Sequence, residues 1–327
     1  MTKRRKDTDY LFLSARIRSL EKSLLTAQRL EQLLQAPSVE SCTQLLADLG
    51  YSPIRDEATL QQSLKQQREA VFAELEGFMP EKELLDVFRI KYDYHNIKTL
   101  LKAPESAERL LMDAGTIPAQ ELRRRYADSG SWRFLPHDMA AAAEKAAAVL
   151  AETGSAQRSD CVLDRACFAQ LEKLAADSRC EYLQRYVCAM IDAANLRSLV
   201  RTERMHMDAG FLQEVLFEGG SVTPEAIRAA AGGGCAAIFR STDLREAAEL
   251  GEAAVKGGSL TAFEKACDNA VLKTAAGARR VPFGVEVALG YVIAKEAEWT
   301  AVRIVMAGRL AGLSPDAIRE RLRDAYV

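Results

Sequence analysis

Acidic and amide side chains recur together in three helix-like segments of this 327-residue sequence. Asp93 stands three positions before Asn96, Asp192 stands three positions before Asn195, and the third segment carries Glu298. Residues at i and i+3 share one face of a helix. Such a carboxylate–amide pair could bind a metal ion or relay a proton. It could equally bond the backbone or an arginine of a neighbouring helix and fix the helix register.

The rest of the sequence offers few further groups for chemistry. The three histidines, His95, His137 and His206, are scattered without the spacing of a metal-binding pair, and no two cysteines have Cys-x-x-Cys spacing. Glycine clusters at 232–234 and 257–258 lack the strand–loop–helix context and the Gly-Lys-Ser/Thr ending of a phosphate loop. We therefore predict no catalytic residue, no cofactor and no metal site.

The third copy of the motif departs from the other two. It places Ala301 where the earlier copies have asparagine, although Glu298 keeps the acidic position. A packing device is more readily built three times with one altered copy than a catalytic device, so we predict a structural motif. A basic residue follows each copy, as Lys98, Arg197 and Arg303, and we expect it to point to solvent or to the adjacent helix.

A helical-bundle enzyme remains an alternative at this point. It would use Asp93, Asp192 or Glu298 together with a histidine. Such an enzyme requires the acids to converge on one concave pocket, whereas a structural motif leaves each acid bonded within its own domain.

The elements that carry the motif are predicted to be helices. Apolar residues recur at three- and four-residue steps over 10–34, which predicts one helix that Pro37 and Ser38 end. Further amphipathic helices are expected over 41–49 and 57–76. No segment shows convincing period-two alternation with β-branched residues, so the sequence predicts an all-α fold.

A second landmark follows each copy of the motif. It is a glycine turn with a proline near the next helix start, at 115–118, 220–224 and 312–315. Glycine ends the preceding helix, and proline in a first helical turn forfeits an amide that would be unpaired anyway. Thr223 and Ser314 are expected to cap the helices that begin at their prolines. Two landmarks in the same order predict three similar helical-repeat domains. The predicted domains are residues 1–128, 129–231 and 232–327.

Charge and hydropathy restrict the partners. The formal net charge is −2 and the pI is about 6.1, so we expect no nucleic-acid binding. The basic run at 3–6 is followed by Asp7 and Asp9 instead of an apolar stretch, so no secretory signal is expected. The longest apolar run, 281–294, is interrupted by Glu286 and is too short to span a bilayer. We expect any membrane contact to be made through a partner.

The segment from Tyr92 to Ala103, which contains Asp-Tyr-His-Asn, resembles the central motif of the C subunit of V/A-type ATP synthases. In the eukaryotic vacuolar ATPase, the d subunit corresponds to it. The opening helix from Tyr10, the segment from Asp192 to Arg197 and the ending from Lys295 to Arg319 are also similar to the family. Ala301 departs from the polar residue expected there, which speaks against three equivalent sites.

This resemblance implies a non-catalytic rotor subunit. Its three domains would surround a pseudo-threefold axis in a funnel. It would be peripheral, on the cytoplasmic face of the membrane rotor ring of ion-carrying proteolipid subunits. Its other end would accept the central shaft, made of the D and F subunits, and so join H⁺ or Na⁺ transport to ATP synthesis or hydrolysis elsewhere in the complex. The alternative is a generic cytosolic helical-repeat adaptor, whose motifs would look the same.

Overall fold

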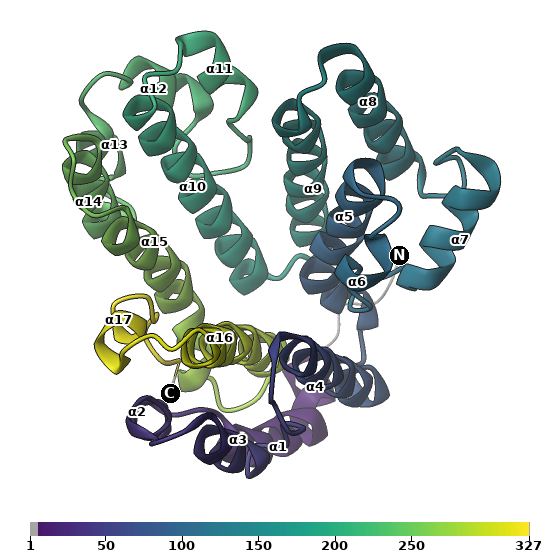
Figure 1. Ribbon diagram of the computed structural model, residues 1–327, viewed down its shortest axis with the longest axis vertical. Coiled ribbons are helices and arrows are strands. Elements are labelled where there is room, and N and C mark those ends of the chain that lie inside the picture. Colours follow the sequence, from purple (N-terminus) through teal and green to yellow (C-terminus); the bar gives the residue numbers. More distant parts are fainter. Residues whose placement is uncertain (1–5, 327) are drawn as a thin grey trace.

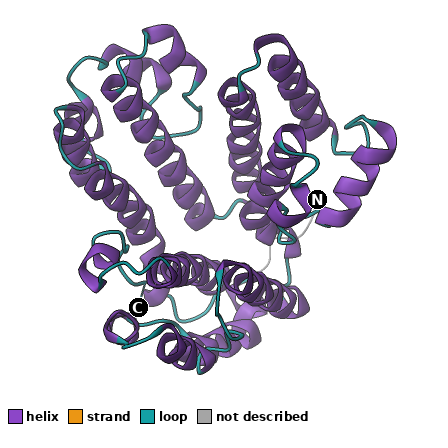
Figure 2. Ribbon diagram, in the orientation of Figure 1, coloured by secondary structure: helices purple, strands orange, loops and turns teal. Residues whose placement is uncertain are grey.

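The computed structural model describes residues 6–326, and all regular secondary structure in this range is helical (Figure 2). The prediction of an all-α fold is therefore confirmed. The α-helices are α1 (Leu11–Leu20), α2 (Ala27–Gln35), α3 (Val39–Ala47), α4 (Glu57–Phe78), α5 (Asp86–Lys102), α6 (Ala107–Leu110), α7 (Ala119–Ser129), α8 (His137–Thr153), α9 (Ala156–Ser178), α10 (Glu181–Arg204), α11 (Ala209–Glu214), α12 (Pro224–Ala229), α13 (Cys235–Phe239), α14 (Arg245–Val255), α15 (Leu260–Ala275), α16 (Val285–Leu310) and α17 (Pro315–Arg319). The 3₁₀-helices are η1 (Asp7–Tyr10), η2 (Glu21–Ser23), η3 (Lys82–Leu85) and η4 (Ala276–Arg280).

The first predicted helix is interrupted, so the expectation of one continuous helix over 10–34 is wrong. The backbone becomes extended at Leu24, with φ −68° and ψ 153°. Thr26 then caps α2 by accepting a hydrogen bond from the Arg29 amide at 3.2 Å. Between them, the Leu25 amide donates to the side chain of Glu298 at 2.8 Å. Hydrophobic periodicity did not predict this break, because the bond that accompanies it comes from the far end of the chain.

The predicted caps of two short helices are confirmed. The Thr223 hydroxyl accepts from the Ala226 amide, and the Ser314 hydroxyl accepts from the Ala317 amide, each at 3.3 Å. In both helices the following proline occupies the first turn, where its missing N–H leaves no bond unmade.

The three helices that carry the motif, α5, α10 and α16, each pack against another long helix. Helix α5 packs on α9, which also packs on α8. Helix α10 packs on α15 and α14, and α16 packs on α4, α1 and α3. Figure 1 shows these helices as three groups, of which the lowest in the view combines the first and last helices of the chain.

The packing joins segments that the predicted division separates. Helix α4 lies in the first predicted domain, yet it packs on α16 of the third. The division after residues 128 and 231 follows the sequence landmarks and stays a prediction, as do the funnel shape and the pseudo-threefold axis. No helix among residues 6–326 combines the length and apolarity needed to cross a bilayer.

Candidate functional site

The repeated motif lies inside the protein in all three copies. Asp93, Asn96 and Asn195 have no exposed surface, and Asp192 and Glu298 expose only 3% and 4%. A buried polar group costs free energy unless it is hydrogen-bonded. The partners of these side chains therefore show what the motif holds together.

Each asparagine pairs with the backbone of a later residue through two hydrogen bonds. The Asn96 side-chain amide donates to the Met112 carbonyl and its oxygen accepts from the Met112 amide, both at 2.8 Å. Asn195 makes the same two bonds with Phe217, also at 2.8 Å. A side-chain amide offers a donor and an acceptor side by side, so it satisfies both backbone groups at once.

Asp93 holds the turn that comes next in the chain. It accepts hydrogen bonds from the Thr116 amide at 3.0 Å, the Thr116 hydroxyl at 2.6 Å and the Ile117 amide at 3.1 Å. Burial raises the pKa of the Asp93 carboxyl, and these hydrogen bonds partly oppose the rise. Asp93 and Asn96 thus share one loop rather than bonding to each other.

Asp192 repeats this arrangement in α10. It accepts from the hydroxyl of Ser221 and from the Val222 amide, the latter at 3.2 Å. Burial again raises the pKa of the carboxyl, with the bond from Ser221 acting in the opposite direction. The first two copies therefore share a geometry as well as a sequence.

The landmark glycines of these two copies are required by close approach. A Cβ atom added at Gly115 would lie 2.1 Å from Oδ1 of Asp93, and one added at Gly220 would lie 2.4 Å from Oδ1 of Asp192. At Gly312 the reason differs, because φ is +71° and nothing lies within 4 Å of an added Cβ. Only this third glycine owes its place to the left-handed conformation of a helix end.

Glu298 does not bond to a nearby turn as Asp93 and Asp192 do; it bonds to residues near the other end of the chain. It accepts from the Leu25 amide at 2.8 Å and from the Tyr51 hydroxyl at 2.7 Å, and forms a buried ion pair with Lys295. Burial and the adjacent Glu298 charge raise the pKa of Tyr51 well above its ordinary value, which keeps its hydroxyl protonated as the donor. The third copy ties the N-terminal helices to α16.

Two of the three basic residues point to the adjacent helix. Lys98 pairs with Asp164 of α9 at 2.6 Å. Arg197 pairs with Glu264 of α15 at 2.7 Å and also with Asp268. Arg303, by contrast, is exposed and takes part in no ion pair with the described residues.

The three acids do not converge on one pocket. Asp93, Asp192 and Glu298 lie on separate helices, and each is bonded to its own neighbouring segment. The helical-bundle enzyme required convergence, so the geometry contradicts that alternative.

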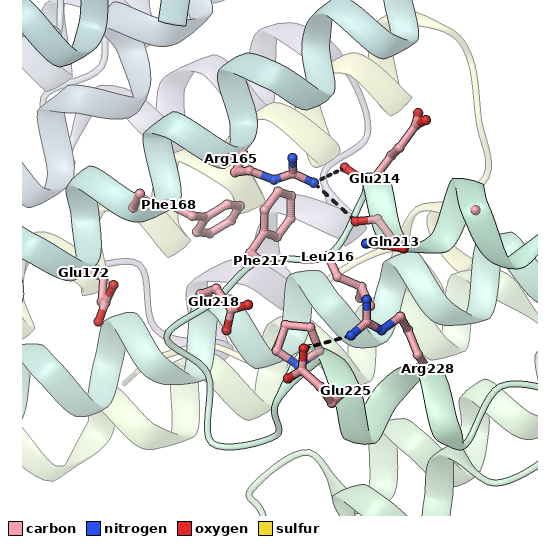
Figure 3. A pocket seen from close by; sticks show the side chains of 13 residues that line it. Arg165, Phe168, Glu172, Gln213, Glu214, Leu216, Phe217, Glu218, Glu225 and Arg228 are labelled. Carbon is pink, nitrogen blue, oxygen red and sulfur yellow. Dashed lines mark hydrogen bonds and ion pairs between the residues drawn. The ribbon is translucent and has the colours of Figure 1, made fainter.

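A cleft of about 940 Å³ lies between α9 and the segment of α11 and α12 (Figure 3). Phe168 and Phe217 pack in it with ring centroids 4.5 Å apart. Arg165 donates to the backbone carbonyls of Gln213 and Glu214, at 3.2 and 2.7 Å. This arginine is thus already engaged in joining two helices, and none of the motif side chains lines the cleft.

Comparisons with known proteins agree along almost the whole chain. A family model described as the ATP synthase (C/AC39) subunit matches residues 13–321. The C subunit of the V-type sodium ATPase of Enterococcus hirae is 24% identical over 326 residues, covering 97% of this chain and 99% of that protein. The C subunit of the A-type ATP synthase of Methanocaldococcus jannaschii is 25% identical, covering 96% and 86%. The C subunit of the V-type ATP synthase of Thermus thermophilus is 26% identical, covering 93% and 94%.

Proposed function

The chain belongs to the ATP synthase C/AC39 subunit family, and on that premise we propose that it couples ion flow to rotation in a V/A-type rotary ATPase. As a member of this family it is a non-catalytic subunit of the complex. In the proposal, it is the central-stalk subunit between the membrane rotor ring of proteolipid subunits and the shaft made of the D and F subunits. It would be peripheral on the cytoplasmic face of the membrane, which it touches only through its partners.

The observation that carries the proposal is the match over residues 13–321, because a whole-length match concerns the subunit rather than one shared module. The same match favours the coupler over a generic cytosolic helical-repeat adaptor. The protein would contribute to H⁺ or Na⁺ transport mechanically, while other subunits handle ATP.

The internal bonds suit a part that transmits force. One charge that crosses 100 mV carries about 2.3 kcal/mol. In the proposal, the subunit transmits this energy from the ring to the shaft without deforming. We infer that Asp93, Asn96, Asp192, Asn195 and Glu298 stiffen the subunit, because each fixes a loop or a chain end to a long helix through buried hydrogen bonds.

A pull-down from detergent-solubilised membranes of the source organism tests the proposal. The tagged full-length chain should retain proteolipid ring subunits together with the D and F subunits, identified by mass spectrometry. Resin carrying the tag alone is the control. A chain that remains in the soluble fraction and retains none of these subunits would exclude the coupling function.

A further inference from the structure

Arg68 of α4 is a buried charge with no ion-pair partner in the part of the chain that the structure describes. It exposes 7% of its surface, and its Nε atom makes no hydrogen bond with any described residue. Its guanidinium carbon lies 5.9 Å from the ring centroid of Tyr92 and 5.7 Å from that of Trp299. Aromatic faces attract a cation, but they give no acceptor to its N–H groups. A buried guanidinium in this position therefore lacks a hydrogen-bonding anion.

Trp299 adds a second unpaired donor beside the first. Its side chain is 2% exposed, and its indole N–H has no acceptor among residues 6–326. On α16 it stands between Glu296 and Arg303, three and four positions away, so all three occupy one face of the helix. Arg68 from α4 lies over the Trp299 ring on that face.

Arg303, an exposed residue one helical turn after Trp299, brings a second guanidinium that is partly shielded from water. Removal of water by the surrounding protein lowers its pKa, and the neighbouring positive charge of Arg68 lowers it further. Glu57 and Tyr92 act on Arg303 in the opposite direction, but neither forms an ion pair or hydrogen bond with it. The two arginines thus repel each other, neither forms an ion pair with any residue among 6–326, and Arg303 is the exposed member of the cluster.

Glu296, on the same helical face as Trp299, is already engaged in an ion pair. Glu296 pairs with Lys91 of α5 and accepts a bond of 3.4 Å from the Tyr92 hydroxyl. Burial alone would lower the pKa of Lys91, but the charge of Glu296, the adjacent Tyr92 and the hydrogen bond to Glu296 together outweigh burial and raise it. After this pair is counted, Arg68 and Arg303 remain as two positive charges where α4, α5 and α16 meet.

We propose that Arg68, Trp299 and Arg303 form a binding site for one carboxylate, supplied by an aspartate or glutamate side chain at the foot of the central shaft. The identity of that partner rests on the proposed coupling function, whereas the preference for a carboxylate rests on the donors. A planar carboxylate accepts two parallel N–H bonds from a guanidinium, and its second oxygen leaves a lone pair for the indole N–H. Such an ion pair between the shaft and this subunit would hold the two in register, because its charges are partly shielded from water.

The test measures the affinity of the full-length chain for the purified D and F subunits of the shaft. Arg303→Glu should weaken binding at least about tenfold at low salt, and the loss should shrink as salt screens the charges. Arg68→Met should weaken it as well, with a thermal melt to establish that the variant is folded. Arg124→Glu, on the exposed surface of α7, is the matched charge reversal and should bind like the unaltered chain.

A second measurement is independent of the shaft. The chain has two tryptophans, so Trp132→Phe leaves Trp299 as the sole indole fluorophore. Acetate should shift its emission with saturation, phosphate should shift it less, and Arg303→Glu should abolish the response. No response to acetate, or an equal response in Arg303→Glu, would overturn the carboxylate site. Unaltered shaft binding by both arginine variants would overturn the assignment of its partner, and failure of the unaltered chain to bind the shaft would instead reject the coupling function.

Discussion

The motif in α5 and α10 differs from the motif in α16 in how far along the chain its acid reaches. Asp93 bonds to the Thr116 amide 23 residues away, and Asp192 bonds to the Val222 amide 30 residues away. Glu298 bonds to Tyr51 and Leu25, which are 247 and 273 residues away. The acidic position of the motif thus bonds a nearby turn in the first two copies. In the third copy it joins the two ends of the chain.

This difference explains why the third copy can lack its amide. Asn96 and Asn195 each satisfy both backbone groups of a residue in the returning loop. Glu298 instead receives a backbone amide, a tyrosine hydroxyl and the Lys295 ammonium. Ala301 therefore accompanies a change of partner rather than a simple loss of function in the motif.

Replacing Glu298 should have the largest effect on stability. Glu298→Ala would leave Lys295 as an unpaired buried charge and would remove the acceptor of Leu25 and Tyr51. Breaking a buried ion pair on one side costs about 3–5 kcal/mol. Urea unfolding of Glu298→Ala should show a loss in this range. Glu31→Ala, which removes a surface carboxylate paired with Arg319, should lose far less, because water screens an exposed ion pair. Equal losses of stability in the two variants would contradict the conclusion that Glu298 joins the N-terminal segment to α16.

The two local copies should be sensitive to any side chain at their glycines. Gly115→Ala and Gly220→Ala would press a methyl group onto the Asp93 and Asp192 carboxylates, and overpacking of this kind costs about 1–3 kcal/mol. Thermal melts would measure the loss. Gly77→Ala in α4 is the control, because nothing lies within 4 Å of its added Cβ. If Gly115→Ala melted like Gly77→Ala, close approach could not be the reason for glycine at this turn.

Removing one side-chain amide should cost less stability than breaking the buried ion pair of Glu298 and about as much as the glycine substitutions. Asn96→Leu leaves the N–H and C=O of Met112 without their partner, at a cost of about 1–3 kcal/mol for an unsatisfied buried group. The Asp93/Asn96 double replacement should cost less than the sum of the single ones, because both side chains hold one loop. Urea titrations of the two single variants and the double variant measure this coupling. Unchanged unfolding in all three would refute the structural role.

The dependence of stability on pH should be the smallest effect. Burial raises the pKa of both Asp93 and Asp192 in the folded state above the ordinary value of 3.8. Because the pKa is raised in the folded state, each group's contribution to the free energy of unfolding is fully present below pH 3.8. It declines as the pH rises through the folded pKa. Carbon-13 NMR titration of the two carboxyls should give midpoints above 3.8. Midpoints below 3.8 would show that the hydrogen bonds outweigh burial.

Much of the helical architecture could be predicted from sequence because its causes are local. Apolar periodicity indicated an all-α fold, and Thr223 and Ser314 cap the helices that their prolines open. The break at Leu24 and the partners of Glu298 could not be predicted, since the bonds that Glu298 makes there join residues 247 and 273 positions apart. Nor could the unpaired state of Arg68, which depends on the packing of α4 against α16.

Hydrogen exchange in two variants most directly tests the contrast between the motif copies that bond a nearby loop and the copy that bonds the N-terminal segment. In Glu298→Ala, we expect faster amide exchange from Leu24 to Tyr51, with the loop from Met112 to Ile117 unchanged. In Asn96→Leu we expect the reverse pattern. Faster exchange of the same segments in both variants would contradict the claim that these copies hold different parts of the chain together.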